Sequence, residues 1–426
     1  MGIQRPKGTQ DIIPGSVEKW HYLEEQIHAI CSEYGYKEIR TPIFEATELF
    51  QRGVGETTDI VNKEMYTFLD KGERSITLRP EGTASVCRAY SENKLYALQQ
   101  PVKMYYLGPM FRYENTQAGR FRQFHQFGAE VLGGEDPMVD AEIICLIWEL
   151  LRRLGLKGLE VQINSVGCPK CRAEHRTRLQ EFLHEKKAGL CADCQNRFSK
   201  NPMRILDCKN KTCQTLTENA PTTLDTLCED CSTHFEKVKS YLEIADIRYR
   251  INPKMVRGLD YYQKTAFEIS AEGIGAQSAI CGGGRYDGLV AEIGGPPTPG
   301  IGFAMGLERI LSVMEKQNIQ IDTDPVSPII LAALGDHARK EAFKLMSDFR
   351  QAGLPVIMDL LGRGLKNQLK YADREHARYV LIIGDDELAK KVAVVRDMRL
   401  GDQQEIAIEN IKTFLIENNK ISGKEL

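Results

Sequence analysis

The chain has 426 residues, a hydrophobic fraction of 42% and a charged fraction of 27%, values typical of a globular protein with two or three domains and a sizeable core. It has no run of about 18 or more apolar residues and no apolar N-terminal leader, so we expect neither a membrane span nor export, and a cytoplasmic location. A formal net charge of −3 argues against a protein that coats nucleic acid, although local basic surfaces can still bind RNA.

Residues 1–155 are predicted to form a helix at each end and strands between them. Apolar residues recur at helical spacing from Val17 to Ile30, and Gly35 ends this helix. Pro42 follows in an extended segment, and because proline cannot donate to a central ladder it indicates a sheet edge or an interface. Strands without regular intervening helices indicate a largely antiparallel sheet. The strands are predicted around SITLRP (75–80), KMYYLGPMFRYE (103–114) and RQFHQFGAEVLG (122–133), and the second helix at 141–155.

Residues 167–246 differ from the rest of the chain. Strand patterns disappear there, and eight of the 12 cysteines lie between Cys168 and Cys231. Sheet-like patterning resumes near residue 254, so we expect residues 167–246 to be a cysteine-rich helical subdomain inserted into a first domain of residues 1–321. In a chain without an export signal, cysteine pairs two residues apart indicate metal binding or redox chemistry more than disulfides.

The spacing of these cysteines predicts one or two structural zinc ions. The pairs Cys168/Cys171 and Cys191/Cys194 are separated by 19 residues, close to the spacing of a zinc ribbon. A second four-thiolate site would then use the other four cysteines, Cys208, Cys213, Cys228 and Cys231. The alternative is a set of reduced cysteines packed as small apolar side chains.

The C-terminal region follows a polar, proline-bearing linker at 322–328. Beyond it, the short apolar runs PIILAAL, LPVIMDL and YVLIIG alternate with helical segments, and VAVVRD adds a further strand. This alternation predicts a separate α/β domain, residues 326–426, with a sheet covered on both faces.

Two segments of the first domain place polar groups on strands. TLRPEGT (77–83) brings the carboxylate of Glu81 and the hydroxyl of Thr83 to a strand end, for which a salt-bridged turn is the simpler interpretation. In FRYENTQAGRFRQFHQFGAEV (111–131), residues spaced by two place arginine, phenylalanine, glutamine and glutamate on one face of a strand. Such a face suits neither solvent nor a core, so it indicates the floor of a site for a polar ligand with an aromatic base. The alternative is an exposed hairpin held by charge pairs. The residues on that face are Arg122, Phe124, Gln126, Gly128 and Glu130.

Three later segments complete the candidate chemistry. RGLDYY (257–262) combines an arginine, which suits a carboxylate or phosphate ligand, with two tyrosine hydroxyls. The alternative interpretation is that the two tyrosines are an aromatic pair at an interface. CGGGRYDGL (281–289) is interpreted as a glycine-rich loop, and GIGFAMGLERI (300–310) places Arg309 near the start of a helix. The glycine spacing matches neither a P-loop nor a dinucleotide fingerprint.

Taken in order, these segments resemble the histidyl-tRNA synthetase family over essentially the whole chain. GYKEIRTPIFE (35–45) is similar to the first class II signature, at the dimer interface, FRYE with RFRQFHQ to the second, and GIGFAMGLER (300–309) to the third. RGLDYY and GGGRYDGL resemble two segments peculiar to the histidine enzymes, and the C-terminal domain resembles their anticodon-binding domain. The cysteine-rich run departs from the family pattern.

The resemblance implies an α+β fold, in which the class II antiparallel sheet is flanked by helices and carries a helical insertion and a C-terminal α/β anticodon-binding domain. It also implies a two-step reaction. The histidine carboxylate attacks the α-phosphorus of ATP, with Mg²⁺ on the departing pyrophosphate, and the terminal adenosine of tRNA(His) then takes the histidyl group.

The resemblance assigns roles to individual residues. Arg112 and Arg257 would be the catalytic cations at the α-phosphate, while Glu130 and Tyr262 would address the two imidazole nitrogens, one a donor and one an acceptor. ATP would be bound by Arg112, Glu114, Arg120, Phe124 and Arg309. Histidine would be bound by Glu81, Gly82, Thr83, Arg112, Gln126, Glu130, Arg257, Tyr261 and Tyr262.

The resemblance also implies partners and leaves two alternatives. A homodimer is expected from the first signature, and the insertion is expected to contact the acceptor arm of the tRNA. One alternative is a synthetase for another amino acid of the same subclass, against which RGLDYY argues. The other is a synthetase-like regulatory subunit of ATP phosphoribosyltransferase, which typically lacks the anticodon domain and has a degraded catalytic set.

Overall fold

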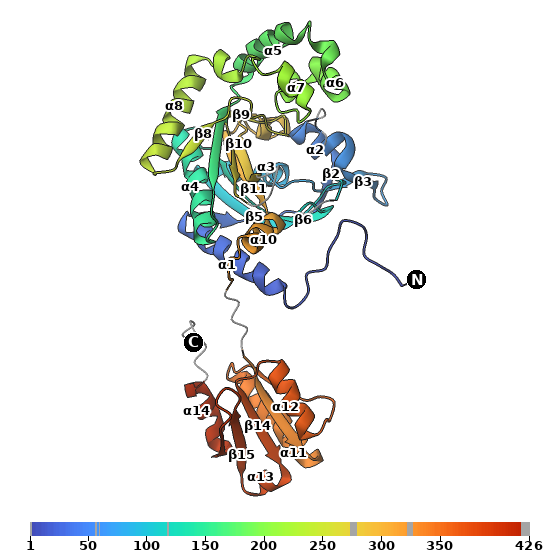
Figure 1. The fold of residues 1–426 in the computed structure, drawn as a ribbon, viewed down its shortest axis with the longest axis vertical. Coiled ribbons are helices and arrows are strands. Elements are labelled where there is room, and N and C mark those ends of the chain that lie inside the picture. Colours follow the sequence, from blue (N-terminus) through green and yellow to red (C-terminus); the bar gives the residue numbers. More distant parts are fainter. Residues whose placement is uncertain are drawn as a thin grey trace. The chain divides into compact units, whose positions relative to one another are not determined.

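The computed structural model describes residues 2–55, 58, 60–116, 119–272, 279–321 and 327–418, so most of the predicted linker at 322–328 lies outside the described residues. The chain forms two compact units, Met1–Ile321 and Asp322–Leu426, each with its own core (Figure 1). Among the described residues, no helix is long and apolar enough to cross a membrane.

The first unit is built on an eight-stranded sheet with the order β1-β5-β6-β11-β10-β9-β7-β8. Only β1 with β5 and β7 with β8 pair in parallel, so the prediction of a largely antiparallel sheet is confirmed. The strands are β1 (Lys37–Glu38), β5 (Val102–Phe111), β6 (Gln123–Leu132), β7 (Glu160–Ser165), β8 (Tyr249–Ile251), β9 (Gln263–Ser270), β10 (Ala279–Arg285) and β11 (Gly300–Gly306).

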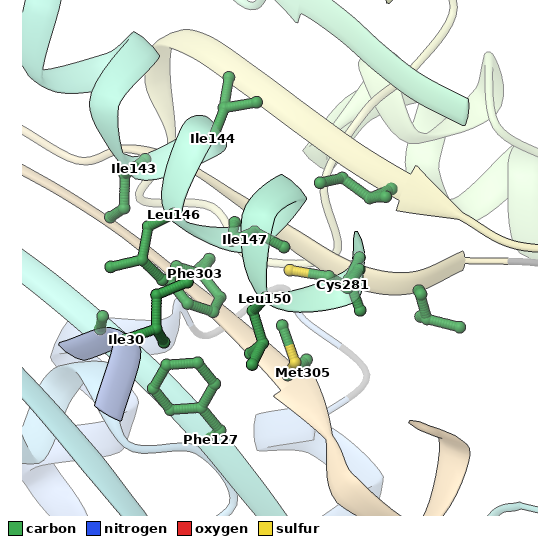
Figure 2. Close-up of a cluster of buried hydrophobic side chains, with 14 of the residues drawn as sticks. Ile30, Phe127, Ile143, Ile144, Leu146, Ile147, Leu150, Cys281, Phe303 and Met305 are labelled. Carbon is green, nitrogen blue, oxygen red and sulfur yellow. The ribbon is translucent and has the colours of Figure 1, made fainter. Parts of the chain in front are cut away.

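One face of this sheet is covered by α1 (Val17–Glu33), α4 (Pro137–Arg153) and α10 (Leu307–Lys316). Helix α4 begins where Asp136 accepts a hydrogen bond from the Met138 amide, and it buries an apolar stripe that includes Ile143, Ile147 and Leu150. Figure 2 shows this stripe meeting Phe127 of β6 and Phe303 of β11. The main core therefore lies between α4 and the middle of the sheet.

The opposite face meets α3 (Thr83–Glu92), the short helix α9 (Leu289–Glu292) and α2 (Thr47–Val54). A three-stranded sheet of order β2-β4-β3 lies beside them. Because strand residues alternate between faces, Gln126, Gly128 and Glu130 of β6 turn away from the core of α4 and toward this second face. The small sheet consists of β2 (Phe44–Ala46), β3 (Tyr66–Leu69) and β4 (Ser75–Leu78).

The chain between β7 and β8 is helical throughout its regular elements, and most of it gathers at one end of the first unit (Figure 1). Its small core includes Leu179, Leu183, Ile205 and Leu206, and helix α8 returns to pack on α4. The helices of this insertion are α5 (Pro169–Leu183), α6 (Ala192–Lys200), α7 (Lys211–Leu216) and α8 (Glu229–Ile244).

The triple glycine of CGGGRYDGL is not a loop, as the sequence indicated, but the middle of the buried strand β10. An added Cβ at Gly282 would collide with the Arg257 guanidinium, one at Gly283 with the Gly302 carbonyl, and one at Gly284 with the Thr265 carbonyl. The glycines are therefore needed for close approach within a central strand rather than for turning.

The second unit has a five-stranded sheet of order β13-β12-β14-β15-β16. The first three strands are parallel, and β15 and β16 add an antiparallel edge. Separate buried clusters lie on the two faces of this sheet, in agreement with the predicted covering of both faces. Its elements are β12 (Ile329–Leu334), α11 (Asp336–Gln351), β13 (Val356–Met358), α12 (Leu365–Arg374), β14 (Tyr379–Gly384), α13 (Asp385–Ala389), β15 (Val392–Asp397), β16 (Gln403–Ala407) and α14 (Ile408–Asn418).

Candidate functional site

A polar cavity of about 310 Å³ lies on the α3 face of the large sheet. Strands β6 and β10, the start of α10 and the segment 257–262 supply its walls. The cavity brings together residues of the five segments 77–83, 111–131, 257–262, 281–289 and 300–310, and arginines and carboxylates are prominent in its lining.

Glu81 is fixed at one end of this cavity by the first turn of α3. Its carboxylate accepts hydrogen bonds from the backbone amides of Thr83 at 2.8 Å and Ala84 at 2.9 Å. Burial has the largest influence on the pKa of this carboxyl and raises it, although the hydrogen bonds from the two amides act to lower it. Glu81 is thus a preoriented carboxylate at a helix N-terminus rather than part of a salt-bridged turn.

Glu130 lies beneath the cavity and is fully buried. It accepts hydrogen bonds from the hydroxyls of Thr83 at 2.7 Å and Tyr286 at 2.5 Å. Burial raises the pKa of Glu130 to about 8, despite these two donors, and the nearby Glu81 adds to the increase. An added Cβ at Gly302 would collide with the Glu130 carboxylate, so glycine is required at that position of β11.

Arg112 and Arg257 face the cavity from different elements. The Arg112 Nε donates to the Pro80 carbonyl at 2.8 Å, and its guanidinium lies 5.4 Å from the centre of the Phe124 ring. Arg257 forms an ion pair with Glu268 of β9, and its guanidinium lies 5.7 Å from the Tyr262 ring centre. Both cations are therefore held by protein groups before any ligand arrives.

A second pair of arginines lines the outer part of the cavity. Arg120 lies 3.3 Å from Glu114, and the Arg309 Nη1 donates to the Ala279 carbonyl at 2.6 Å. Phe124 lines the cavity as well and presents an aromatic ring beside these charges. This part of the cavity has the groups that a nucleotide polyphosphate requires, namely cations and a ring for stacking.

Two buried polar atoms in the site have no hydrogen-bond partner. They are the side-chain oxygen Oε1 of Gln126 and the Nε of Arg257. Because buried polar groups are nearly always paired, an unpaired acceptor and an unpaired donor in one cavity indicate a ligand that supplies the missing partners.

The cavity includes most of the residues assigned from the sequence. Gly82 and Glu130 do not line it: a Cβ at Gly82 would meet the Tyr106 ring, and Glu130 lies below the floor. The residues that do line it are Glu81, Thr83, Arg112, Glu114, Arg120, Phe124, Gln126, Arg257, Tyr261, Tyr262 and Arg309.

Three supporting residues were missed by the sequence analysis. Glu268 holds Arg257, and Tyr286 holds Glu130. Glu308 accepts a hydrogen bond at 2.9 Å from the amide of His125, whose ring packs against Trp20 on the other face. The available signal for Glu268 was a carboxylate between the apolar residues Phe267 and Ile269 of β9.

The eight cysteines of the insertion form two compact groups, with the sulfur atoms of each group within 4.8 Å of one another. Their pairing differs from the zinc-ribbon interpretation, which joined neighbouring pairs along the chain. The first pair joins the last, because the N-termini of α5 and α8 meet at the base of the insertion. The groups are Cys168, Cys171, Cys228 and Cys231, and Cys191, Cys194, Cys208 and Cys213.

A largely antiparallel sheet flanked by helices, with a separate α/β unit at the C-terminus, is the architecture of class II aminoacyl-tRNA synthetases. The family model for histidyl-tRNA synthetases matches residues 8–310, and one for an anticodon-binding domain matches residues 328–418. The chain is 64% identical over 423 residues to a histidine–tRNA ligase of Desulfitobacterium hafniense, covering 99% of this chain and 100% of that protein. It belongs to the histidyl-tRNA synthetase family.

Solved structures agree with this assignment. The apo histidyl-tRNA synthetase of S. aureus has a TM-score of 0.83 and 41% identity, covering 97% of this chain and 99% of that chain. A protein from Bacillus halodurans, described as an ATP phosphoribosyltransferase regulatory subunit/histidyl-tRNA synthetase, has a TM-score of 0.63 and 22% identity, covering 90% of this chain and 99% of that chain. At that identity it shares the fold alone.

Proposed function

We propose that the chain joins L-histidine to tRNA(His), using ATP to form histidyl-adenylate and pyrophosphate first. The observation that carries this proposal is the 64% identity to a histidine–tRNA ligase along essentially the whole chain. The polar cavity supplies the groups that the first step needs.

The first step brings two anions together, so catalysis requires positive charge at the α-phosphorus. A carboxylate oxygen of histidine forms the new P–O bond, and the bond to the β-phosphate breaks as pyrophosphate leaves. In our proposal Arg112 and Arg257 bind the α-phosphate from two sides, and Arg257 also binds the histidine carboxylate. Their existing contacts with Pro80 and Glu268 support the role, because a preorganised cation needs little reorientation during reaction.

The nucleotide would occupy the outer part of the cavity. Phe124 would stack on adenine, Glu114 would lie close to the base, and Arg120 and Arg309 would bind the outer phosphates. ATP would enter as its Mg²⁺ complex, in which the ion screens the charge of the leaving pyrophosphate.

Histidine would bind between the α3 terminus and the two tyrosines. Glu81, Thr83 and Gln126 would take the α-amino group, and the unpaired oxygen of Gln126 supports this. Tyr262, which packs against Tyr261, would address one imidazole nitrogen, and Glu130, from below the cavity floor, would address the other. A pocket that hydrogen-bonds both nitrogens rejects analogues strongly, because its own polar groups would otherwise stay unpaired.

In the second step the terminal adenosine of tRNA(His) would attack the carbonyl carbon, and AMP would leave. We propose that the second unit binds the anticodon arm, and the insertion the acceptor arm. On the helix α12, the exposed Lys366 and Lys370 are candidates for RNA contact, with Arg363 beside them.

We also propose a homodimer that works in the cytoplasm. The small sheet exposes the large apolar side chains of Phe44, Phe68 and Leu69, and Ile43 just before β2 is exposed as well, which supports a partner surface there. Light scattering is expected to give twice the chain mass of 48.1 kDa, and the chain mass alone would reject the dimer.

The cofactor proposal includes structural zinc bound by the eight cysteines of the insertion, since closed four-thiolate sites favour zinc. Metal analysis of protein purified without chelator is expected to find it, and less than half an equivalent of zinc per chain would reject it.

Charging of a tRNA(His) transcript with labelled amino acids tests the complete reaction. Histidine alone should be transferred, and the product should be labile to mild base as an ester. Folded protein that charges no amino acid would instead support the regulatory-subunit alternative, in which ATP phosphoribosyltransferase activity should respond to the chain.

A further inference from the structure

The two cysteine groups lie on the parts of the insertion that hold the segment 257–262. Cys168 precedes α5 and Cys171 lies in its first turn, while Cys228 and Cys231 occupy the matching positions of α8. We call these four the junction group, because they join the two ends of the insertion. Cys191, Cys194, Cys208 and Cys213 form the distal group, which packs into the small core of the insertion.

The sulfur geometry fits a tetrahedral metal ion in both groups. A zinc ion with Zn–S bonds of about 2.3 Å places its sulfurs about 3.8 Å apart. Cys168 lies 3.5 Å from Cys171 and 3.9 Å from Cys228, and in the distal group Cys191 lies 3.9 Å from Cys208. These separations exceed the 2.05 Å or so of a disulfide and lie close to those of a shared ion.

Backbone groups in both cysteine groups are placed to stabilise thiolates, the form that a metal requires. The backbone amide of Cys228 donates to the Cys171 sulfur at 3.1 Å, and that of Cys191 to the Cys213 sulfur at 3.3 Å. Cys168, Cys191 and Cys228 each stand at the N-cap of a helix, where the helix dipole stabilises negative charge. All four positions in each group are cysteines, so neither site leaves an open position for substrate.

One helix of each group carries a residue that is hydrogen-bonded to the segment 257–262: Arg172 on α5, and Asn201 at the C-terminal cap of α6, whose first turn holds Cys194. Arg172 follows Cys171 directly, and its Nη1 donates to the carbonyls of Asp260 at 3.3 Å and Tyr262 at 3.2 Å. Asn201, at the end of α6, donates to the Asp260 carboxylate at 2.8 Å. The segment itself supplies Arg257, Tyr261 and Tyr262 to the cavity.

The junction group has a second connection to the cavity through α8. One turn after Cys231, the His234 ring lies 2.5 Å from Asp140, which also accepts from Arg285 of β10. The residue after Arg285 is Tyr286, whose hydroxyl holds Glu130. Asp140 and Arg285 are fully buried, so α8 and β10 have little freedom to move relative to one another at these contacts.

We propose that the insertion binds two zinc ions, one in each group, and that the bound ions position the segment 257–262 for histidine through Arg172 and Asn201. The link to histidine rests on the proposed function, whereas the metal sites and the ordering of the segment do not. Arg172 and Asn201 are positioning residues, since they contact the backbone and side chain of the segment rather than the cavity.

The metal sites are tested by elemental analysis of the full-length protein purified without chelator. Wild type should contain two equivalents of zinc, Cys228→Ser one and Cys208→Ser one. Cys145→Ser is the matched control, because Cys145 lies on α4 outside both groups, and it should keep two. One equivalent or less in wild type, or iron in place of zinc, would overturn the assignment of two zinc ions.

The positioning role is tested with Arg172→Ala, in which both groups remain intact. This variant should keep two zinc ions, show faster hydrogen exchange of the amides of 257–262 without substrates, and bind histidine about tenfold more weakly, with ATP affinity unchanged. Arg172→Lys should recover part of the affinity. Unchanged exchange in Arg172→Ala would overturn the positioning role. Faster exchange with no histidine binding by wild type would instead reject the proposed function.

Discussion

At the scale of single residues, Arg112 is the most direct test of the proposed chemistry. Replacing it by alanine removes a preorganised cation, so the rate of adenylate formation should fall by roughly 10²–10³. The melting temperature should change little, because Arg112 is only partly buried. Pre-steady-state adenylate formation is the measurement, and Arg74→Ala, an arginine whose side chain is 80% exposed in the β3–β4 turn, is the control. A rate within threefold of wild type would contradict the role.

Glu130 predicts a pH dependence of stability. Its pKa is about 8 in the folded protein against an ordinary value near 4.5, so between those values the folded state binds a proton that the unfolded state has lost. Stability should therefore fall as pH rises from 5 to 8. Glu130→Gln cannot ionise, so its melting temperature should fall less over that range. Parallel curves for the two proteins, measured without substrates, would show that Glu130 is ionised throughout.

The residues of the site could be found from sequence where they occur in compact ordered segments. Phe124 and Gln126, which line the cavity, were predicted because strand alternation places even-numbered residues of β6 on one face, whereas Arg112 was assigned from the resemblance of FRYE to the second class II signature. Tyr286 and Glu268 were not recognised, since their importance lies in contacts with Glu130 and Arg257 on other strands.

At the scale of elements, α4 should make the largest packing contribution to the first unit. Leu150 is fully buried in the core shown in Figure 2, and truncation there leaves a cavity. Leu150→Ala should lower the free energy of unfolding by about 2–5 kcal/mol. Met138→Ala on the same helix, with its side chain 54% exposed, should change it by less than about 0.5 kcal/mol.

Urea unfolding followed by tryptophan fluorescence measures this change. Both tryptophans, Trp20 on α1 and Trp148 on α4, belong to the first unit and border the core in question, so the signal reports that unit. Equal losses in Leu150→Ala and Met138→Ala would contradict the assignment of the core.

Helix α4 and strand β10 show which features could be predicted from the sequence and which could not. The helix at 141–155 was predictable because a buried amphipathic face has a period that is visible locally. The glycines of β10 indicated a loop, because the groups that crowd them, Arg257 and the carbonyls of Thr265 and Gly302, lie on other segments. The cysteine pairing failed for the same reason: the meeting of α5 and α8 is a tertiary contact that the spacing cannot encode.

At the scale of the whole molecule, the two units should divide the reaction. Each has its own core, so residues 1–321 should fold alone and keep histidine-dependent activation. Without the second unit, the contact with the anticodon arm would be lost, and kcat/KM for tRNA charging should fall by about 10² or more because two linked contacts bind far more tightly than one. Equal kcat/KM for tRNA charging by the full chain and by residues 1–321 would contradict a tRNA-binding role of the second unit.

The central claim is that the polar cavity activates histidine and no other amino acid. Pyrophosphate exchange into ATP, measured with each amino acid in turn on purified protein with Mg²⁺, tests it most directly. The account predicts exchange with histidine alone, and its loss in Arg257→Ala. Exchange with a different amino acid, or with none from folded protein that contains intact cavity residues, would contradict it.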